Sequence, residues 1–203
     1  MQEIILASAS PRRKQLLEQV GLEFSCMTAD VDEEAFYNLH PGDLVKKLAW
    51  QKAQAVAGRT EQNIIIAADT VVVLDDVIMG KPLDREDARQ KLTLLSGREH
   101  QVMTGICVVN QQNESHSTEF EVTKVWFRHL SNGEIQGYLD CGEWVDKAGG
   151  YGIQGLGALL IEKIDGCYFN VVGLPLSKLY QLLYKQGVYL LGGEAPNGVQ
   201  GWN

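Results

Sequence analysis

Residues 63–74 read Asn63-Ile-Ile-Ile-Ala-Ala-Asp-Thr-Val-Val-Val-Leu74, an apolar run interrupted by one carboxylate. Isoleucine and valine are β-branched and favour strands, and a continuous apolar run is typical of a strand covered on both faces. The segment therefore predicts a buried strand or strand pair. Asp69 comes directly after the isoleucine and alanine residues, at the kind of strand position where open α/β sheets place their ligands.

Shorter apolar runs alternate with amphipathic segments on both sides of this stretch. Strands are predicted at residues 3–7, 22–27, 77–79, 101–110, 119–128, 158–164 and 168–172. Helices are predicted at residues 10–20, 43–57, from 84 onward, 131–139 and 175–185. Strands interspersed with helices, with two long strands following each other, favour an α/β domain built on a mixed sheet.

The length of 203 residues suits one domain. We expect this domain to cover residues 1–190, because no linker, repeat or low-complexity block interrupts them. Residues 191–203 are rich in Gly and Asn and are expected to form a flexible tail. The four cysteines contain no Cys-x-x-Cys pair, which argues against a zinc or dithiol site and favours a reducing compartment.

The charge balance separates classes of partner. Lys and Arg number 18 against 26 Asp and Glu, so the net charge is −8 and general nucleic-acid binding is disfavoured. The N-terminus carries an acid where a secretory signal needs basic residues, and no apolar run reaches the length of a membrane span. A cytoplasmic protein without membrane contact is the expectation.

A first candidate site follows the first predicted strand, where residues 6–13 read Leu-Ala-Ser-Ala-Ser-Pro-Arg-Arg. Ser10 and Pro11 are typical of a helix start, and the N–H groups of such a turn can bind an anion. Arg12 and Arg13 oppose the helix dipole there, which makes sense if a phosphate lies between them and the helix end. Two solvated arginines beside a helix cap explain the same residues equally well.

Carboxylates provide a second candidate site. Asp69 interrupts a strongly apolar segment, and an acidic run at residues 30–34 includes Asp32, Glu33 and Glu34. Two carboxylates from separate loops are what Mg²⁺ needs in order to bridge to phosphate oxygens. The acidic run by itself is also explained as a solvated loop.

Lys52 and Lys81 add cations to this picture. Lys52 lies on the apolar stripe of its predicted helix, where a lysine either extends past the core edge or points into a cleft. Lys81 stands between Gly80 and Pro82, in a loop that a ligand can approach closely. With Arg12 and Arg13, these lysines form a candidate anion clamp on an acidic protein.

Residues 146–155 form a glycine-rich segment with Gly-x-Gly-x-x-Gly spacing. A dinucleotide fingerprint opens a helix, whereas strand-like residues 158–161 follow here, so we reject that interpretation. The segment is expected to be a shaped loop that presents Lys147, Tyr151 and Gln154 to a ligand. His100 is expected to be a structural histidine and not a base.

In this order, the motifs resemble the Maf family of nucleoside triphosphate pyrophosphatases. The matching stretches are residues 6–13, 68–72, 80–82, 96–97 with 100–105, 146–155 and 172–176. The resemblance covers about residues 3–187 and implies an elongated, mixed-sheet α/β fold of the inosine-triphosphate-pyrophosphatase type with a central cleft. It also implies a divalent cation, Mg²⁺ or Mn²⁺, and a nucleoside triphosphate substrate. Proteins of this kind often form a homodimer.

The resemblance also assigns roles. Asp69 is implied as the catalytic carboxylate, with Glu33 as its partner in catalysis and in metal binding, although Asp32 and Glu34 lie beside it. The triphosphate would be held by Ser8, Arg12, Arg13, Lys52 and Lys81. Arg12, Thr70 and Gln154 match the branch that cleaves dTTP and UTP to the monophosphate and diphosphate, whereas the 7-methyl-GTP branch tends to carry Trp, Gln and Glu there.

Three alternatives remain open at this stage. The substrate could be 7-methyl-GTP, or a modified uridine or thymidine triphosphate. The protein could also be a nucleotide-binding regulator of cell division and septum formation without catalysis. A nucleic-acid-binding domain is a further class, and the charge of −8 without a basic, aromatic face counts against it.

Overall fold

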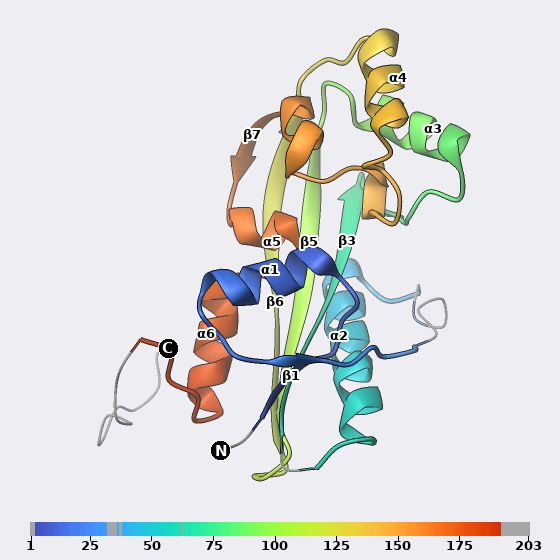
Figure 1. Cartoon of the computed structure of the whole chain (residues 1–203). Coiled ribbons are helices and arrows are strands. Elements are labelled where there is room, and N and C mark those ends of the chain that lie inside the picture. The colour runs from blue at the N-terminus through green and yellow to red at the C-terminus, as the bar shows by residue number, and fades with distance from the viewer. Residues whose placement is uncertain (1–2, 32–35, 37, 62, 192–203) are drawn as a thin grey trace.

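The computed structural model describes residues 3–31, 36, 38–61 and 63–191, and its central element is β3 (Ile64–Leu74) (Figure 1). This single strand pairs in parallel with β1 (Ile4–Leu6) and antiparallel with β5 (Glu99–Asn110). The apolar run therefore forms one strand and not a strand pair. Beyond Asp75 and Asp76, which adopt positive φ angles in a tight turn, β4 (Val77–Met79) folds back onto β3.

The sheet has the strand order β2-β1-β3-β5-β6-β7, with β4 on β3 beside this path. Its other members are β2 (Ser25–Cys26), β6 (Ser115–Phe127) and β7 (Ile161–Asp165). The helices are α1 (Pro11–Gln19), α2 (Pro41–Ala57), α3 (Arg85–Leu95), α4 (Asn132–Cys141), α5 (Tyr168–Val172) and α6 (Leu176–Lys185). Parallel and antiparallel pairs occur in one sheet, so the expected mixed-sheet α/β class is confirmed.

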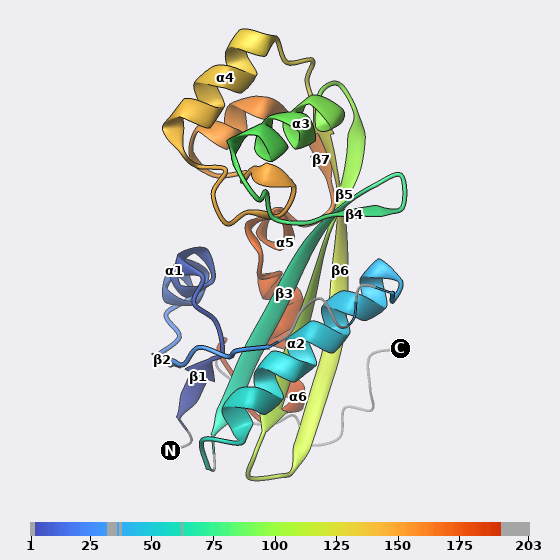
Figure 2. The ribbon, with the colours of Figure 1, turned by 90° about the vertical axis from the view of Figure 1, so that its right-hand side faces the viewer.

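Helices cover the two faces of the sheet unequally (Figure 2). One face packs against α1 and α6 in the lower half and against α3 and α4 in the upper half, while α2 covers the opposite face. The long strands β3, β5 and β6 run through both halves, which gives the elongated shape seen in Figure 1. Between these two pairs of helices, the middle of the first face is covered by loops and by α5.

Side-chain caps start three helices where the sequence indicates them. The side chains of Ser10, Asp84 and Ser131 each accept a hydrogen bond from the backbone N–H three residues later. At Ser131 the Glu134 carboxylate also accepts a hydrogen bond from the cap N–H, which completes a capping box. These helix starts are confirmed because a cap depends on local sequence alone.

The strand predicted at residues 168–172 is wrong, since these residues form the helix α5. The side-chain amide of Asn170 is buried and donates to the Val102 carbonyl and to Thr123 Oγ1, contacts that come from distant strands. Residues 158–160 also differ from the prediction: they end a 3₁₀ helix (Gly155–Leu160), and β7 begins at Ile161. Short apolar runs do not distinguish a strand from a buried helical turn.

Gly105 determines how closely α2 approaches the sheet. It lies opposite Asp69 in the β3–β5 register. A Cβ atom at this position would lie 2.2 Å from the Val45 carbonyl oxygen and 2.7 Å from the Lys46 nitrogen. Only glycine leaves room for the helix backbone there.

We therefore expect Gly105→Ala to destabilise the protein by about 1–3 kcal/mol or more, because the added methyl group meets backbone that cannot rotate away. Gly137→Ala is the matched control: this exposed glycine inside α4 has nothing within 4 Å of an added Cβ. The control should raise the free energy of unfolding by up to about 1 kcal/mol. Urea unfolding measures both variants, and a neutral Gly105→Ala would contradict the packing argument.

Candidate active site

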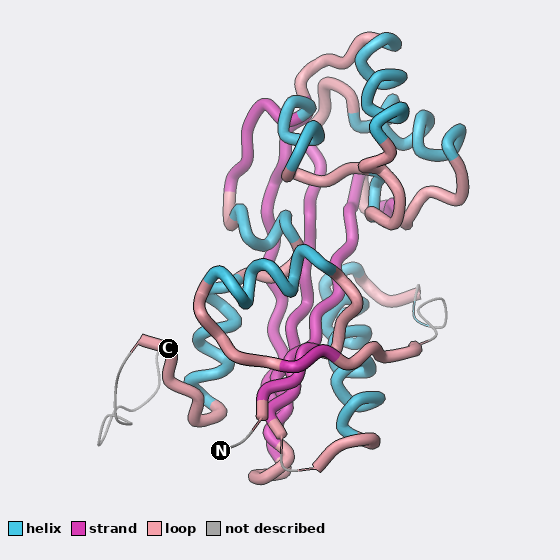
Figure 3. The backbone as a smooth tube through the Cα atoms, in the orientation of Figure 1, coloured by secondary structure: helices cyan, strands magenta, loops and turns pink. Residues whose placement is uncertain are grey.

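A cleft of about 750 Å³ opens at the middle of the molecule. Its lower wall comes from the β1–α1 turn and its upper wall largely from loops, which are drawn pink in Figure 3. The predicted site residues that line it are Ser8, Arg12, Arg13, Lys52, Asp69, Thr70, Lys81 and Gln154. The structure thus brings together residues from five separate parts of the sequence.

The cleft meets β3 at an edge that no strand covers among the described residues. Pairing with β1 ends at Ile66, and pairing with β4 begins at Val72. Successive side chains of a strand point to opposite faces, so Asp69 lies with Val71 on the α2 side and Thr70 lies with Val72 on the other side. Both residues line the same cleft because the cleft wraps around the edge of β3.

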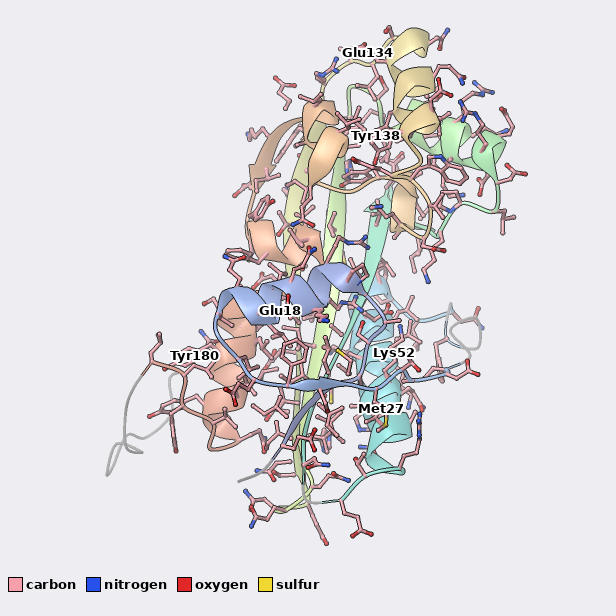
Figure 4. All side chains as sticks on the ribbon, viewed as in Figure 1. Glu18, Met27, Lys52, Glu134, Tyr138 and Tyr180 are labelled. Atoms are coloured by element: carbon pink, nitrogen blue, oxygen red, sulfur yellow. The ribbon has the colours of Figure 1, made fainter. Side chains whose placement is uncertain are left out.

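On the α2 side, Lys52 Nζ lies 2.5 Å from Asp69 Oδ1. The two side chains are only 14% and 9% exposed, so this ion pair is largely shielded from water. Figure 4 shows Lys52 on α2, which runs along the sheet. Side chains of a helix lean toward its N-terminus, and this direction brings Lys52 up to Asp69. Of the two interpretations of Lys52, the structure supports the one that points into the cleft.

On the opposite side, Arg13 ties three segments together. Its Nε donates to the Gly173 carbonyl at 2.8 Å, its Nη1 to Ser8 Oγ at 3.2 Å and its Nη2 to Thr70 Oγ1 at 3.0 Å. The guanidinium group therefore joins the β1–α1 turn, the residue after α5 and β3. This holds Ser8 and Thr70 at fixed positions on the cleft wall.

Arg12 faces the upper half of the molecule. Burial lowers the pKa of its half-buried guanidinium group, whereas Tyr138 and Asp146 raise it. Across the cleft, burial also lowers the pKa of Lys147, and the positive charge of Arg12 lowers it further. Lys147 donates a hydrogen bond to the Glu143 carbonyl, and its aliphatic chain packs on Gly152. Two cations from different halves thus face one cleft, an arrangement that suits an anion.

The glycine-rich segment forms a loop with short 3₁₀ turns, of which the first covers Ala148–Gly150. Gly149 N donates to the Gly80 carbonyl at 3.2 Å, which ties this loop to the segment that carries the exposed Lys81. Gln154 is half-buried and lines the cleft. Tyr151 also lines it, but its hydroxyl group bonds His100 Nε2 at 2.6 Å. The polar atom of Tyr151, like that of Lys147, is therefore engaged within the protein.

His100 is 2% exposed, and its ring contacts Phe127 and Tyr151 edge-on. Burial lowers its pKa to about 4. The burial of His100, its ring contacts and its bond to Tyr151 agree with the expectation of a structural histidine.

Glu33, with Asp32 and Glu34, lies outside the described residues, so its metal-binding role stays a prediction. No cluster of three or more His, Cys, Asp or Glu side chains suited to a metal occurs in the part of the chain that the structure describes. Nor is any helix in that part both long and apolar enough to cross a membrane.

Sequence reasoning missed Thr104 and Asn170. Both are fully buried, and Thr104 Oγ1 lies 3.0 Å from Thr70 Oγ1 and 3.0 Å from the Asn170 carbonyl. The sequence did offer one indication of Thr104, because it is a polar residue among the apolar residues of β5. Tyr138 was also missed: its hydroxyl group is an acceptor for Gly152 N at 3.4 Å, and it lies in the upper half (Figure 4).

The fold and the site define an α/β protein with a cationic cleft around one buried carboxylate. The chain matches the Maf-like protein family over residues 3–186, and it belongs to that family. The resemblance found in the motifs is thereby confirmed.

Relatives match over nearly the full length. A protein of Desulforamulus reducens is 49% identical over 191 residues, which cover 94% of this chain and 100% of the relative. One of Clostridioides difficile is 49% identical over 182 residues, covering 90% and 94%. Both are named dTTP/UTP pyrophosphatase.

Two solved structures are more distantly similar. A nucleoside-triphosphatase, dITP/XTP pyrophosphatase, of Mycobacterium abscessus has a TM-score of 0.43 and 16% identity, covering 64% of this chain and 76% of its own. A HAM1 protein of Coxiella burnetii has a TM-score of 0.44 and 18% identity, covering 66% and 77%.

The low pKa of His100 predicts a pH dependence of stability. Below about pH 6.5 the unfolded chain binds a proton at this residue, while the folded protein does not until the pH approaches 4. The free energy of unfolding should therefore fall as the pH falls from about 6.5 to 4, by about 2 kcal/mol at pH 5 from this residue alone.

Urea unfolding at pH 7 and pH 5 measures this effect. His100→Gln removes the titrating group and should show a smaller loss of stability at pH 5 than the wild type. His116→Gln, at an exposed position, should behave as the wild type does. Equal pH dependence in all three proteins would contradict the assignment.

Proposed function

We propose that this protein hydrolyses dTTP and UTP to the nucleoside monophosphate and diphosphate. The observation that carries the proposal is the Asp69 carboxylate, buried at the wall of a cleft that Arg12, Lys81 and Lys147 also line. A cationic cleft on a chain of net charge −8 favours a small polyanion, since the field of the whole protein repels larger ones. The full-length relatives named dTTP/UTP pyrophosphatase support this substrate choice.

The arrangement around Asp69 suits the removal of a proton from water. Lys52 Nζ donates a hydrogen bond to Oδ1, and the other carboxylate oxygen would accept the proton. The water oxygen then bonds to the α-phosphorus as the bond from that phosphorus to the bridging oxygen breaks. Diphosphate leaves with the electron pair, and the cleft cations offset its charge.

In this proposal, different residues around the edge of β3 contact the triphosphate and the nucleoside. Lys52, Asp69 and Lys81 would face the triphosphate, with Ser8 and Arg12 at the helix start. Thr70, Gln154 and Arg12 would face the nucleoside, as the dTTP and UTP branch implies. Arg13 was expected at the triphosphate. Its hydrogen bonds to Ser8 and Thr70 support a position between the proposed triphosphate and nucleoside sites.

A divalent cation fits this site. Mg²⁺ is commonly bound by one or two carboxylates together with substrate phosphate oxygens, and Asp69 offers such a carboxylate on the cleft wall. Asp69 would hold Mg²⁺ or Mn²⁺, with Glu33 as the second proposed ligand. When bound, the cation polarises the phosphoryl group and lowers the pKa of water.

Several further expectations belong to the proposal. We infer a cytoplasmic enzyme that binds no nucleic acid and can form a homodimer. The flexible tail expected at residues 191–203 lies, beyond Leu191, outside the described residues. The same reaction on modified uridine or thymidine triphosphates would keep them out of nucleic acids. A nucleotide-binding regulator of division would need the cleft but would not need a buried carboxylate beside Lys52.

Product analysis tests the reaction. Incubation with UTP or dTTP and Mg²⁺ should yield the nucleoside monophosphate and intact diphosphate in equal amounts, because attack occurs at the α-phosphorus. Excess EDTA should abolish turnover, and added Mg²⁺ or Mn²⁺ should restore it. Anion-exchange chromatography separates these products, and release of orthophosphate with a nucleoside diphosphate would overturn the proposal.

Asp69→Asn tests the role of the carboxylate. The change keeps the shape and removes the charge that accepts the proton, so kcat should fall by about a hundredfold or more. Asp75→Asn is the matched control, because Asp75 lies in the exposed turn between β3 and β4 and pairs with Arg98 outside the cleft. The control should retain wild-type kcat, and a folded Asp69→Asn variant with comparable turnover would move the catalytic role to another residue.

A further inference from the structure

The hydroxyl group of Thr70 belongs to a chain of hydrogen bonds that leads away from the cleft. Thr70 and Thr104 lie directly opposite each other in β3 and β5, and their Oγ1 atoms are 3.0 Å apart. Thr104 Oγ1 is also 3.0 Å from the carbonyl oxygen of Asn170 in α5. Arg13 Nη2 approaches Thr70 Oγ1 at 3.0 Å from the other side.

The direction of each bond in this chain follows from the atoms at its two ends. A guanidinium group can only donate and a carbonyl oxygen can only accept. At the end of α5, Gly173 N and Leu174 N both donate to the Phe169 carbonyl oxygen. The carbonyl oxygen of the fully buried Asn170 therefore accepts its hydrogen bond from the Thr104 hydroxyl group. Thr104 has no second proton, and the proton between the two threonines therefore belongs to Thr70.

This direction determines what Thr70 can offer to a ligand. A hydroxyl group has one proton and two lone pairs. The proton of Thr70 goes to Thr104 and one lone pair receives Arg13, so the remaining lone pair is available toward the cleft that Thr70 lines. Toward the cleft, Thr70 acts as an acceptor only.

We propose that Thr104 is a positioning residue for base selection: it holds the Thr70 proton, so that Thr70 accepts a hydrogen bond from the substrate and cannot donate one. The inference rests on the proposed function and deepens it. Uracil and thymine carry a hydrogen on N3, whereas N3 of cytosine is a bare acceptor. An acceptor at Thr70 therefore selects uracil and thymine. With cytosine, the lone pair of Thr70 Oγ1 would face the lone pair of N3.

Thr123 provides a comparison within the same network. It is buried in β6, accepts from Asn170 Nδ2 at 2.8 Å and donates to the Cys167 carbonyl at 3.0 Å. It therefore anchors α5 as Thr104 does, and its hydrogen bonds to Asn170 and Cys167 do not involve Thr70. If base selection depended only on the anchoring of α5, removal of either the Thr104 or the Thr123 hydroxyl group would change it. If it depends on the direction of the Thr70 proton, only removal of the Thr104 hydroxyl group changes it.

The test compares UTP with CTP. In Thr104→Val the Thr70 proton loses its acceptor and can turn toward the cleft, so the ratio of kcat/KM for CTP to that for UTP should rise by about five- to a hundredfold. Thr104→Ser keeps the hydroxyl group and should retain the wild-type ratio. Thr123→Val should lower stability by a similar amount without changing the ratio.

Binding provides a second readout that does not depend on turnover. The dissociation constants of the non-hydrolysable α,β-imido analogues of UTP and CTP should show the same preference in the wild type and the same shift in Thr104→Val. A wild type that binds both analogues equally well overturns the inference even if Thr104→Val fails to fold. An unchanged ratio in folded Thr104→Val also overturns it.

The proposed function and the role of Thr104 can fail separately. If the wild type releases no diphosphate from any nucleotide but still prefers the UTP analogue through Thr104, the proposed function fails and the inference stands. If it cleaves UTP and CTP with equal kcat/KM, the proposed function stands and the inference fails.

Discussion

Asp69 and Thr70 are neighbours in an extended strand, and the geometry of the strand requires their side chains to point to opposite faces of the sheet. Both can line one cleft only because no strand in the described part of the chain pairs with this edge of β3 between the end of β1 pairing and the start of β4 pairing. The rest of the site depends on this edge. It places a carboxylate next to the lysine of α2 and a hydroxyl group next to the arginine of α1.

Each face of β3 is supported by a separate set of contacts. On the α2 side, Gly105 lets the helix backbone lie against the sheet opposite Asp69, and Lys52 completes a largely buried ion pair. A buried carboxylate is costly unless it is paired, so the contact with Lys52 offsets the cost of burying Asp69. On the other side, Arg13 joins the β1–α1 turn, β3 and the end of α5.

The upper half of the molecule brings a different kind of group to the cleft. Its core packs around the rings of His100, Phe127 and Tyr151, and this apolar cluster supports the glycine-rich loop that carries Lys147 and Gln154. Tyr151 belongs to both, since it lines the cleft and its hydroxyl group is held by a histidine with a lowered pKa. The Asp69 carboxylate of β3 and the Gln154 side chain of the loop thus reach one cleft from separately packed halves that share the long strands.

Local chemistry made much of this predictable from the amino-acid order. Helix caps and the apolar run of β3 depend on residue type and spacing. The four cations suggested as an anion clamp all line the cleft, as Asp69 does: Arg12, Arg13, Lys52 and Lys81. The α5 helix, the buried hydroxyl of Thr104 and the tether made by Arg13 were decided by contacts between residues up to 160 positions apart. The periodicity of the sequence does not depend on such contacts. A five-residue apolar run looks the same in a strand and in a buried helix, and a single threonine looks the same whether or not its hydroxyl group joins a network.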